Sequence, residues 1–373
     1  MVDSQEKFEL DFLIKMLDYY SPSGQESELA AHLFDRMKGH MGLKNVRIDS
    51  VGNVLGEIGS GSPVLLLCGH MDTVPGQQSV TLADGQIYGR GAVDAKASLS
   101  SLMMALSRFS KSKFNGKIVM ACVVDEEGVG KGVNNLVQDG LVVNSAIFGE
   151  PSGIDNITIG YKGRLGLRFL CETSSVHASA PWMSNNAVER ILDLWKEIEL
   201  QIANNQSKQK FASISASLTE IRGGSSHNVT PARCEMTVDI RLPPGQSCSP
   251  IISEIERIIS NANKNASIGP PSRISMKIED ATEPFEADKN SGIVRAMIRA
   301  GLTVRGKRPQ LLRKTGTGDM NVLGNALGIP VITFGPGDAH LSHTSKEFVS
   351  VDEYYMSIEL SLRAIINFFS LKD

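Results

Sequence analysis

The chain has 373 residues, with 38 Lys and Arg against 41 Asp and Glu, and a formal net charge of -3. This length allows roughly two domains of ~150 residues, and the near-neutral charge excludes a protein built mainly to bind nucleic acid. The hydrophobic share of 41% and the charged share of 21% are typical of a globular protein and exclude a disordered or collagen-like chain. The longest apolar run, 118–124, is far shorter than the ~20 residues of a membrane helix, so we expect no membrane segment.

The first twelve residues are acidic and lack a basic stretch followed by an apolar one, so they do not predict a signal peptide. The five cysteines are widely spaced and form no CxxC pair. This usage is typical of reduced, buried cysteines. We therefore expect a cytoplasmic protein without disulfides.

The first forty residues predict two helices, over about 8–16 and 28–37. Ser23 is followed three residues later by Glu26, a pattern typical of a helix start. From residue 46 onward, apolar runs that predict strands alternate with predicted helices: VRIDSVGNVLGEIG, PVLLLCGH, a helix over 95–110, KIVMACVV, a helix over 132–138 and LVVNSAIFGEP. Wholly apolar strands of this kind indicate an α/β domain with a mixed, mostly parallel sheet covered by helices.

The pattern changes near residue 157, where half-exposed strands replace the wholly apolar ones. The predicted order is strand, helix, strand, strand, helix, strand, which suggests a small α+β unit of ferredoxin-like type. Its clearest elements are strands over 165–173 and 232–242 and helices over 187–202 and 249–263.

The α/β pattern then resumes with the strand VITF at 331–334 and a helix over 352–370. We therefore expect a small domain over 157–270 to be inserted into a discontinuous domain made of 1–156 and 271–373.

Carboxylates and imidazoles follow the apolar runs. Because ligands bind beyond the carboxyl ends of parallel strands, we expect these side chains to meet at one edge of the sheet. Another carboxylate, Asp94, lies in GRGAVDAK just before a predicted helix. The residues at the strand ends are His70 and Asp72, then Asp125, Glu126 and Glu127, then Glu150, and finally His340 and His343.

A buried cluster of acids repels itself unless protons, water or cations neutralise it. Imidazole and carboxylate ligands suit zinc, cobalt or manganese, and zinc is the metal that we favour. Asp72, two residues after His70, can accept a hydrogen bond from the ring nitrogen that does not bind metal. Any one of these residues alone is more often a loop or capping residue, but the set together favours a metal site. His340 is an alternative to His343, and we prefer His343.

The motifs GHMDTVP, GRGAVDAK, DEEGVG and FGEPS, followed by a late His after a Gly-rich loop, resemble the dizinc metallohydrolase family that includes acetylornithine deacetylase, succinyl-diaminopimelate desuccinylase, aminoacylase and carboxypeptidases. The resemblance covers essentially the whole chain. It implies two divalent ions, with the inserted domain as a lid or dimerisation domain of a homodimer. The implied ligands are His70, Asp94 and Glu150 for one ion and Asp94, Glu127 and His343 for the other, with Asp94 bridging. Glu126 is the implied general base.

The same resemblance implies roles for residues of the inserted domain. His177 would stabilise the oxyanion, often across a dimer interface, and Asn228 and Arg241 would line the substrate side, with Arg241 as a carboxylate clamp. Thr317 precedes a predicted helix in GTGD, where its hydroxyl and the backbone amides could bind a substrate carboxylate. The alternative is that Asp319 is an ordinary helix cap.

The stretches SPSGQE, GEPSG with ITIGYKGRLGL, and RKTGTGDMN resemble the branch that releases lysine or ornithine from the C-terminal glutamate of an amino-group carrier protein, in lysine and arginine biosynthesis. Because such a carrier is small and acidic, the basic run 305–314, with Lys162 and Arg164, is a candidate docking surface. A solvated charge run is the alternative.

Other functions share the same metals and base. A deacetylase of acetylornithine or acetyllysine, a succinyl-diaminopimelate desuccinylase, and a dipeptidase or carboxypeptidase all remain open. A metal-binding scaffold without activity would be expected to lack the base or a ligand, and this chain has both.

Overall fold

The computed structural model describes residues 4–110, 112–203, 209–265 and 272–370. The chain forms two compact units. The first unit consists of Met1–Gly160, Glu286–Arg313 and Gly318–Asp373, and the second of Tyr161–Phe285 and Lys314–Thr317.

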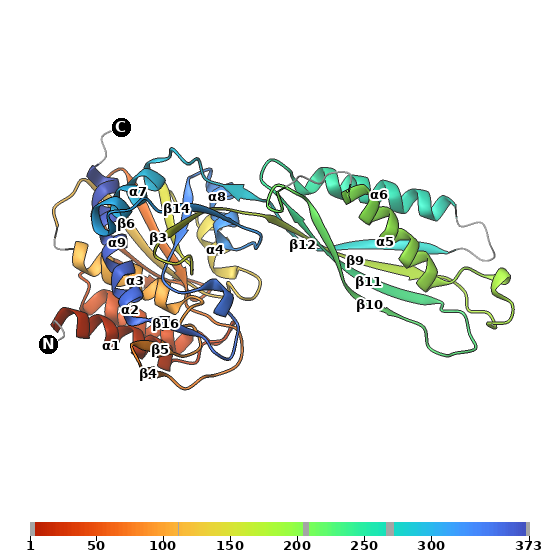
Figure 1. Ribbon diagram of the computed structural model, residues 1–373, viewed down its shortest axis with the longest axis horizontal. Helices are drawn as coiled ribbons and strands as arrows, with labels where there is room; N and C mark the ends of the chain where they lie inside the picture. The colour runs from red at the N-terminus through yellow and green to blue at the C-terminus, as the bar shows by residue number, and fades with distance from the viewer. Residues whose placement is uncertain (1–3, 111, 204–208, 266–271, 371–373) are drawn as a thin grey trace. The chain divides into compact units, whose positions relative to one another are not determined.

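The first unit is built on a mixed sheet whose four central strands are parallel (Figure 1). These strands are β6 (Gly116–Val123), β3 (Val64–His70), β7 (Ser145–Gly149) and β15 (Val331–Phe334). On one side, the antiparallel strands β1 (Lys44–Ile48) and β2 (Val54–Ser60) extend the sheet beside β6. On the other side, β8 (Asn156–Tyr161) pairs antiparallel with β15, and β13 (Phe285–Glu286) and β14 (Gln310–Lys314) pair with β8. A small sheet of β16 (Phe348–Ser350), β5 (Gln86–Tyr88) and β4 (Thr81–Ala83) lies apart from it.

Alternate residues of the central strands face two layers of helices, because side chains along a strand point to opposite faces. Leu65 and Leu67 of β3 join one large core, whereas Leu66 and Cys68, equally buried, face the other side. The first core is covered by α1 (Ser4–Asp18), α2 (Ser27–Gly39), α3 (Lys96–Phe109), α7 (Gly292–Arg305) and α9 (Val351–Ser370). On the other side, α4 (Lys131–Gln138) packs against α8 (Asp319–Leu327), which also contacts β15. The α/β class is confirmed.

The second unit has one antiparallel sheet in the order β10, β11, β9, β12. Its strands are β9 (Gly163–Glu172), β10 (Ser215–Gly223), β11 (Arg233–Leu242) and β12 (Arg273–Thr282), and Figure 1 shows α5 (Ala187–Ala203) and α6 (Cys248–Lys264) on one side of them. The chain order of strands and helices is the one that the sequence predicts. The unit extends beyond residue 270, where the sequence placed its end, because β12 completes the sheet beside β9.

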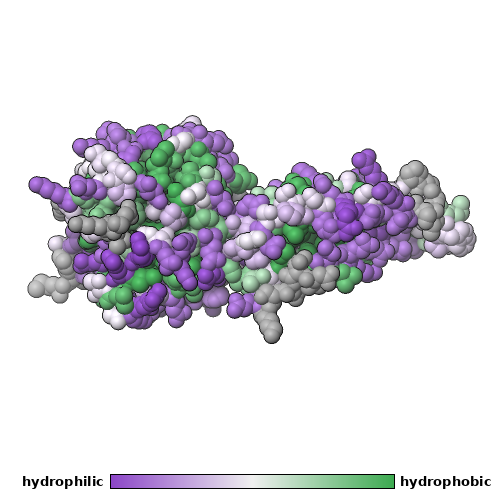
Figure 2. Space-filling model, turned by 90° about the horizontal axis from the view of Figure 1, so that it is seen from above, coloured by the Kyte–Doolittle hydropathy of each residue, from purple (hydrophilic) through white to green (hydrophobic). Residues whose placement is uncertain are grey.

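All five cysteines are buried free thiols. In Figure 2, hydrophilic and hydrophobic side chains are interspersed on the face that is shown. None of the helices in the described ranges combines the length and the apolar character that a membrane crossing needs.

Candidate metal centre

Glycines at the strand ends let the start of α3 approach the sheet closely. A Cβ at Gly149 would lie 3.1 Å from the backbone of Ser98, and one at Gly335 would lie 2.1 Å from the Ser98 hydroxyl oxygen. Asp94 lies two residues before α3, which begins at Lys96, and its carboxylate lies 3.3 Å from His70 at the end of β3. His70 ends β3, and Glu150 follows β7 directly.

Two linked triads of possible metal ligands result, and all their residues belong to the first unit. In the first triad, His70 Nε2 lies 3.3 Å from Asp94 Oδ1 and 3.5 Å from Glu150 Oε1. In the second triad, His343 Nε2 lies 3.3 Å from Asp94 Oδ2 and 2.9 Å from Glu127 Oε1. Asp94 therefore offers one carboxylate oxygen to each triad. His340, the alternative to His343, belongs to neither group among the described residues.

Asp72 organises the loop that carries the two adjacent glutamates. Its Oδ1 accepts the amide hydrogen of Glu126 and its Oδ2 that of Glu127, both at 3.1 Å. The Ser23 hydroxyl donates to Oδ2 at 2.7 Å. His70 Nδ1 lies 3.0 Å from the Asp72 carbonyl oxygen and 3.5 Å from its Oδ1, so Asp72 orients the ring on the side away from the triad.

Two residues that contribute to this edge have a left-handed backbone. Asp125, where β6 turns into the loop, has a φ of 63°, and His343 has a φ of 64°. Residues other than glycine adopt this conformation at a cost of order 1 kcal/mol or more, and such positions cluster at functional sites. At Asp125 the turn is held by Glu26, which accepts its amide hydrogen at 3.1 Å. The Asp125 carboxylate in turn accepts the amide hydrogens of Val129 and Lys131.

Glu126 is poised as an acid or a base. Burial, together with the charges of Asp94 and Glu127 and against the charge of His70, raises the pKa of Glu126 to about 7. A carboxyl with a pKa near neutrality can both take and return a proton. Neither triad includes Glu126, so this carboxyl stands beside the candidate ligands without being one of them.

The residues fit a pair of divalent cations. His70 Nε2 is buried and makes no hydrogen bond within the described residues, although two carboxylate oxygens lie within 3.5 Å of it. Burial opposes a charge on His70, yet the carboxylates of Asp72 and Asp94 outweigh it and raise its pKa well above the usual value. The Asp94 carboxylate, despite burial, has a lowered pKa because His343 and His70 face it. Divalent cations would neutralise these carboxylates and bind the imidazoles in their unprotonated form.

Three residues around this edge were not found from the sequence. Ser23 was interpreted as part of a helix start, but α2 begins at Ser27 and the Ser23 hydroxyl instead donates to Asp72. Glu347 is buried and accepts the amide hydrogen of Asp94 at 2.9 Å. Asp319 is also buried, and burial, aided by the charge of Glu126, raises its pKa well above the usual value. The contacts of Ser23 and Glu347 join segments 49 and 253 residues apart in the sequence, so no local pattern indicates them.

Asp319 is not the cap of α8. It is the first residue of the helix, and the Asn321 side chain accepts the amide hydrogen of Gly318, at 3.2 Å, in the capping position. A buried acid with a raised pKa therefore occupies the position that the sequence offered, as the alternative, to an ordinary helix cap.

In the second unit, Arg241 lines a cationic pocket and contacts Thr317. Arg241 Nη1 donates to Thr317 Oγ1 at 3.1 Å, and the Thr317 hydroxyl donates to the Lys162 carbonyl oxygen at 2.8 Å. The pocket has a volume of about 660 Å³ and is lined by residues that include Lys162, Lys210, Asp239 and Arg241. Lys162 is buried, and its Nζ donates to the Ser213 carbonyl oxygen.

His177 and Asn228 lie at the other end of this sheet. The pairing of β9 with β11 continues past Arg233, so that the amide of Ala178 donates to the Asn228 carbonyl oxygen at 2.9 Å. Arg233 and Arg241 are eight residues apart along β11, which is about 26 Å at ~3.3 Å per residue. One copy of the chain therefore cannot bring Asn228 and Arg241 to the same small group.

An α/β sheet with two linked carboxylate and imidazole triads at its carboxyl edge is the arrangement expected of a protein that binds two metal ions. Residues 66–367 match the peptidase family M20/M25/M40, and the chain belongs to that family. This confirms the predicted resemblance. Membership makes the protein a hydrolase of peptide or amide bonds.

The relatives agree with this assignment, and the solved structures share the fold. The chain is 34% identical over 355 residues to the [LysW]-lysine/[LysW]-ornithine hydrolase of Sulfurisphaera tokodaii, covering 95% of this chain and 94% of the relative. It is 32% identical over 359 residues to a relative of the same name from Saccharolobus islandicus, with coverage of 95% and 94%. Its fold is similar to aminopeptidase PepT from Bacillus cereus (TM-score 0.83, 18% identity, 98% and 99% coverage). It is also similar to the dinuclear metal-binding M20 peptidase YXEP of Bacillus subtilis (TM-score 0.72, 14% identity, 97% and 98% coverage).

Proposed function

We propose that this protein hydrolyses the amide bond that joins lysine or ornithine to the carrier protein LysW, as the names of its relatives describe for those proteins. The observation that carries the reaction class is the position of Glu126 beside two triads linked through Asp94. We further propose that the reaction belongs to lysine and arginine biosynthesis in the cytoplasm.

The proposed ligands are the members of the two triads. His70, Asp94 and Glu150 would hold the first cation, and Asp94, Glu127 and His343 the second. Zinc suits this set of imidazoles and carboxylates best, with cobalt or manganese as substitutes. When bound, such ions make a water acidic and polarise the carbonyl of the scissile amide.

Glu126 then carries the proton. Its carboxylate removes a proton from the attacking water and returns it to the nitrogen of the leaving amino acid. Asp72 keeps this base in position, because its carboxylate holds the backbone amides of Glu126 and Glu127 at the same time. The backbone positions of Glu126 and Glu127 are therefore fixed relative to each other.

The cationic pocket of the second unit supports an anionic substrate. A lysine joined through its α-amino group to a glutamate side chain keeps free carboxylates on both sides of the scissile bond. Lys162 and Arg241 provide charge for such a group, and the guanidinium fork of Arg241 suits it geometrically. Asp239 already pairs with Arg241 at 2.6 Å, so a bound carboxylate would compete with this internal pair.

We propose a homodimer in which His177 and Asn228 act on the site of the other copy. The separation along β11 supports this arrangement, because these two residues cannot join Arg241 at one small group within a single copy. The His177 side chain is also exposed, and its Nδ1 lies 2.8 Å from the Ser179 hydroxyl oxygen. From a second copy, His177 would donate a hydrogen bond to the oxyanion.

Mixing two inactive variants tests this dimer. His177→Ala and Glu126→Gln homodimers should each be nearly inactive. If the histidine acts across the dimer, subunit exchange should restore about a quarter of wild-type activity, because half of the dimers are mixed and each has one intact site. No recovery after verified exchange would refute the arrangement.

The basic run 305–314 remains our candidate for docking the acidic carrier. Much of its charge is already paired within the first unit: Arg305 and Lys307 contact Asp155 at 2.8 and 2.7 Å, and Arg313 contacts Glu286. These exposed pairs are weak and can exchange partners.

One experiment separates the possible substrates. The purified enzyme, loaded with zinc, is assayed on LysW-lysine, LysW-ornithine, acetylornithine, succinyl-diaminopimelate and a dipeptide at equal concentration. We expect kcat/KM to be at least tenfold higher for a LysW conjugate, since only that substrate can use both the pocket and a docking surface. Preference for a free acylated amino acid would refute the proposed substrate.

A further inference from the structure

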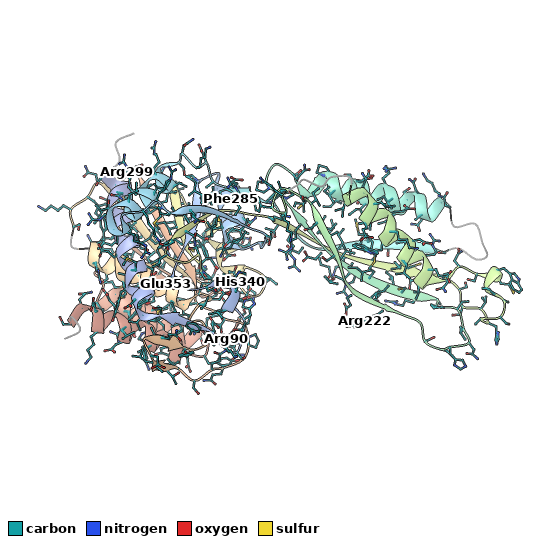
Figure 3. The ribbon with its side chains drawn as sticks, in the orientation of Figure 1. Arg90, Arg222, Phe285, Arg299, His340 and Glu353 are labelled. Atoms are coloured by element: carbon teal, nitrogen blue, oxygen red, sulfur yellow. The ribbon has the colours of Figure 1, made fainter. Side chains whose placement is uncertain are left out.

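A buried ion pair joins two separate loops beside the candidate ligands. Arg90 Nη1 lies 2.7 Å from Glu347 Oε2, and the exposed fractions of the two side chains are 10% and 0%. Figure 3 labels Arg90, which lies between β5 and α3, and Glu347 directly precedes β16. Neither residue belongs to a triad.

Glu347 holds the backbone of the loop that carries Asp94. Its Oε1 accepts the amide hydrogens of Gly91, Val93 and Asp94, at 3.0, 2.9 and 2.9 Å. Three amides on one oxygen fix the direction in which the loop runs. The position of the Asp94 carboxylate therefore depends on Glu347.

Arg90 holds the segment that carries His343. Besides Glu347, its Nη1 donates to the Thr344 carbonyl oxygen at 3.2 Å, and its Nε donates to the Gly76 carbonyl oxygen at 3.2 Å. Gln78 Nε2 donates to the same Thr344 oxygen at 2.9 Å. Thr344 follows His343 directly, so these bonds act on the residue whose backbone is left-handed.

We propose that Arg90 and Glu347 are positioning residues for the second cation. Through this pair, two of the three members of the second triad, Asp94 and His343, are fixed relative to each other. In the first triad, by contrast, His70 and Glu150 are placed by the ends of β3 and β7. Breaking the pair should therefore weaken binding of the second cation more than binding of the first. This inference rests on the ligands assigned in the proposed function.

The test is a stepwise cation titration of the full-length protein against a competing chelator. Glu347→Gln keeps the shape of the side chain but places an amide where Arg90 needs an acceptor. We expect the second cation to bind about 10 to 100 times more weakly, the range seen when groups that orient ligands are lost, and the first to change less. With Co²⁺, the absorption of the second ion should shift. His343→Ala, which removes a ligand, shows which step belongs to the second cation.

A matched control removes a buried ion pair elsewhere in the first unit. Glu9, whose side chain is fully buried, contacts Arg108 with both oxygens at 2.7 Å and has no contact with a triad. Glu9→Gln should lower the Tm while both cation affinities stay within twofold of wild type. This control separates loss of stability from loss of positioning.

Arg90→Lys is the second variant, in case Glu347→Gln does not fold. The lysine keeps a positive charge but cannot reach Glu347, Thr344 and Gly76 together, so the second cation should again be weakened more than the first. Equal affinities in the variants and the wild type, or equal weakening of both cations, would overturn the proposal. A wild-type protein that takes up fewer than two cations would instead refute the proposed function.

Discussion

The sharpest test of the mechanism is Glu126→Gln. Glutamine has nearly the shape of glutamate but cannot take a proton from water. Loss of a general base lowers the rate by about 10²- to 10⁴-fold, which is about 2.7 to 5.5 kcal/mol in the activation free energy. The pKa of Glu126, raised to about 7 mainly by burial, suits a group that takes and returns a proton near neutral pH.

Cation content should not change in this variant, because Glu126 is a member of neither triad. We would measure kcat on the LysW conjugate together with bound zinc by plasma mass spectrometry. The adjacent Glu127→Gln is the matched control: it should lose the second cation as well as activity. A Glu126→Gln enzyme with two bound cations and near-normal kcat would show that another group carries the proton.

Four further outcomes are expected. Asp72→Asn should weaken zinc binding by about 10- to 100-fold in a chelator titration, because one amide oxygen cannot accept both loop amides. Cation affinity should rise with pH up to about 9, because the facing Asp94 carboxylate raises the pKa of His343 to about 9 and the proton on His343 must leave before a cation binds. Calorimetry in buffers of different ionisation enthalpy would detect the released proton. A cation affinity that does not change with pH would contradict the assignment of His343 as a ligand. Gly132→Ala should lower the free energy of unfolding by about 1 to 3 kcal/mol in urea, since its Cβ would lie 2.5 Å from the Val124 carbonyl oxygen; unchanged stability would mean that α4 can shift freely. If the run 305–314 docks the carrier, KM for the LysW conjugate should rise with salt while KM for a small acylated amino acid stays constant.

The sequence indicated most of the site because the signals are local. Wholly apolar runs precede His70, Glu127 and Glu150, and parallel strands end at one edge of a sheet. The proximity of these three side chains could therefore be inferred from the sequence alone. The strand VITF at 331–334 was predicted with its observed bounds for the same reason. Apolar runs that are buried on both faces leave little choice of secondary structure.

What the sequence did not reveal depends on contacts between distant segments. Glu347 follows His343 by four residues, and nothing nearby shows that it meets the loop before Asp94. Ser23 lies in a pattern typical of a helix start, yet its hydroxyl donates a hydrogen bond to Asp72, which is 49 residues away in the sequence. The separation of Asn228 from Arg241 also needed the observed register, because a motif does not show how far apart along the sheet its residues lie.

The position of β15 has a consequence for how the protein is made. It begins at residue 331 and pairs with β7, which ends at residue 149, so 182 residues separate the two partners. At ~5–20 residues per second, a ribosome needs about 10 to 40 s to cover that interval. Until then β7 has an unpaired edge, and His343 has not yet been added. A product truncated before residue 331 would therefore retain His70 and Glu150 on a sheet edge open to aggregation.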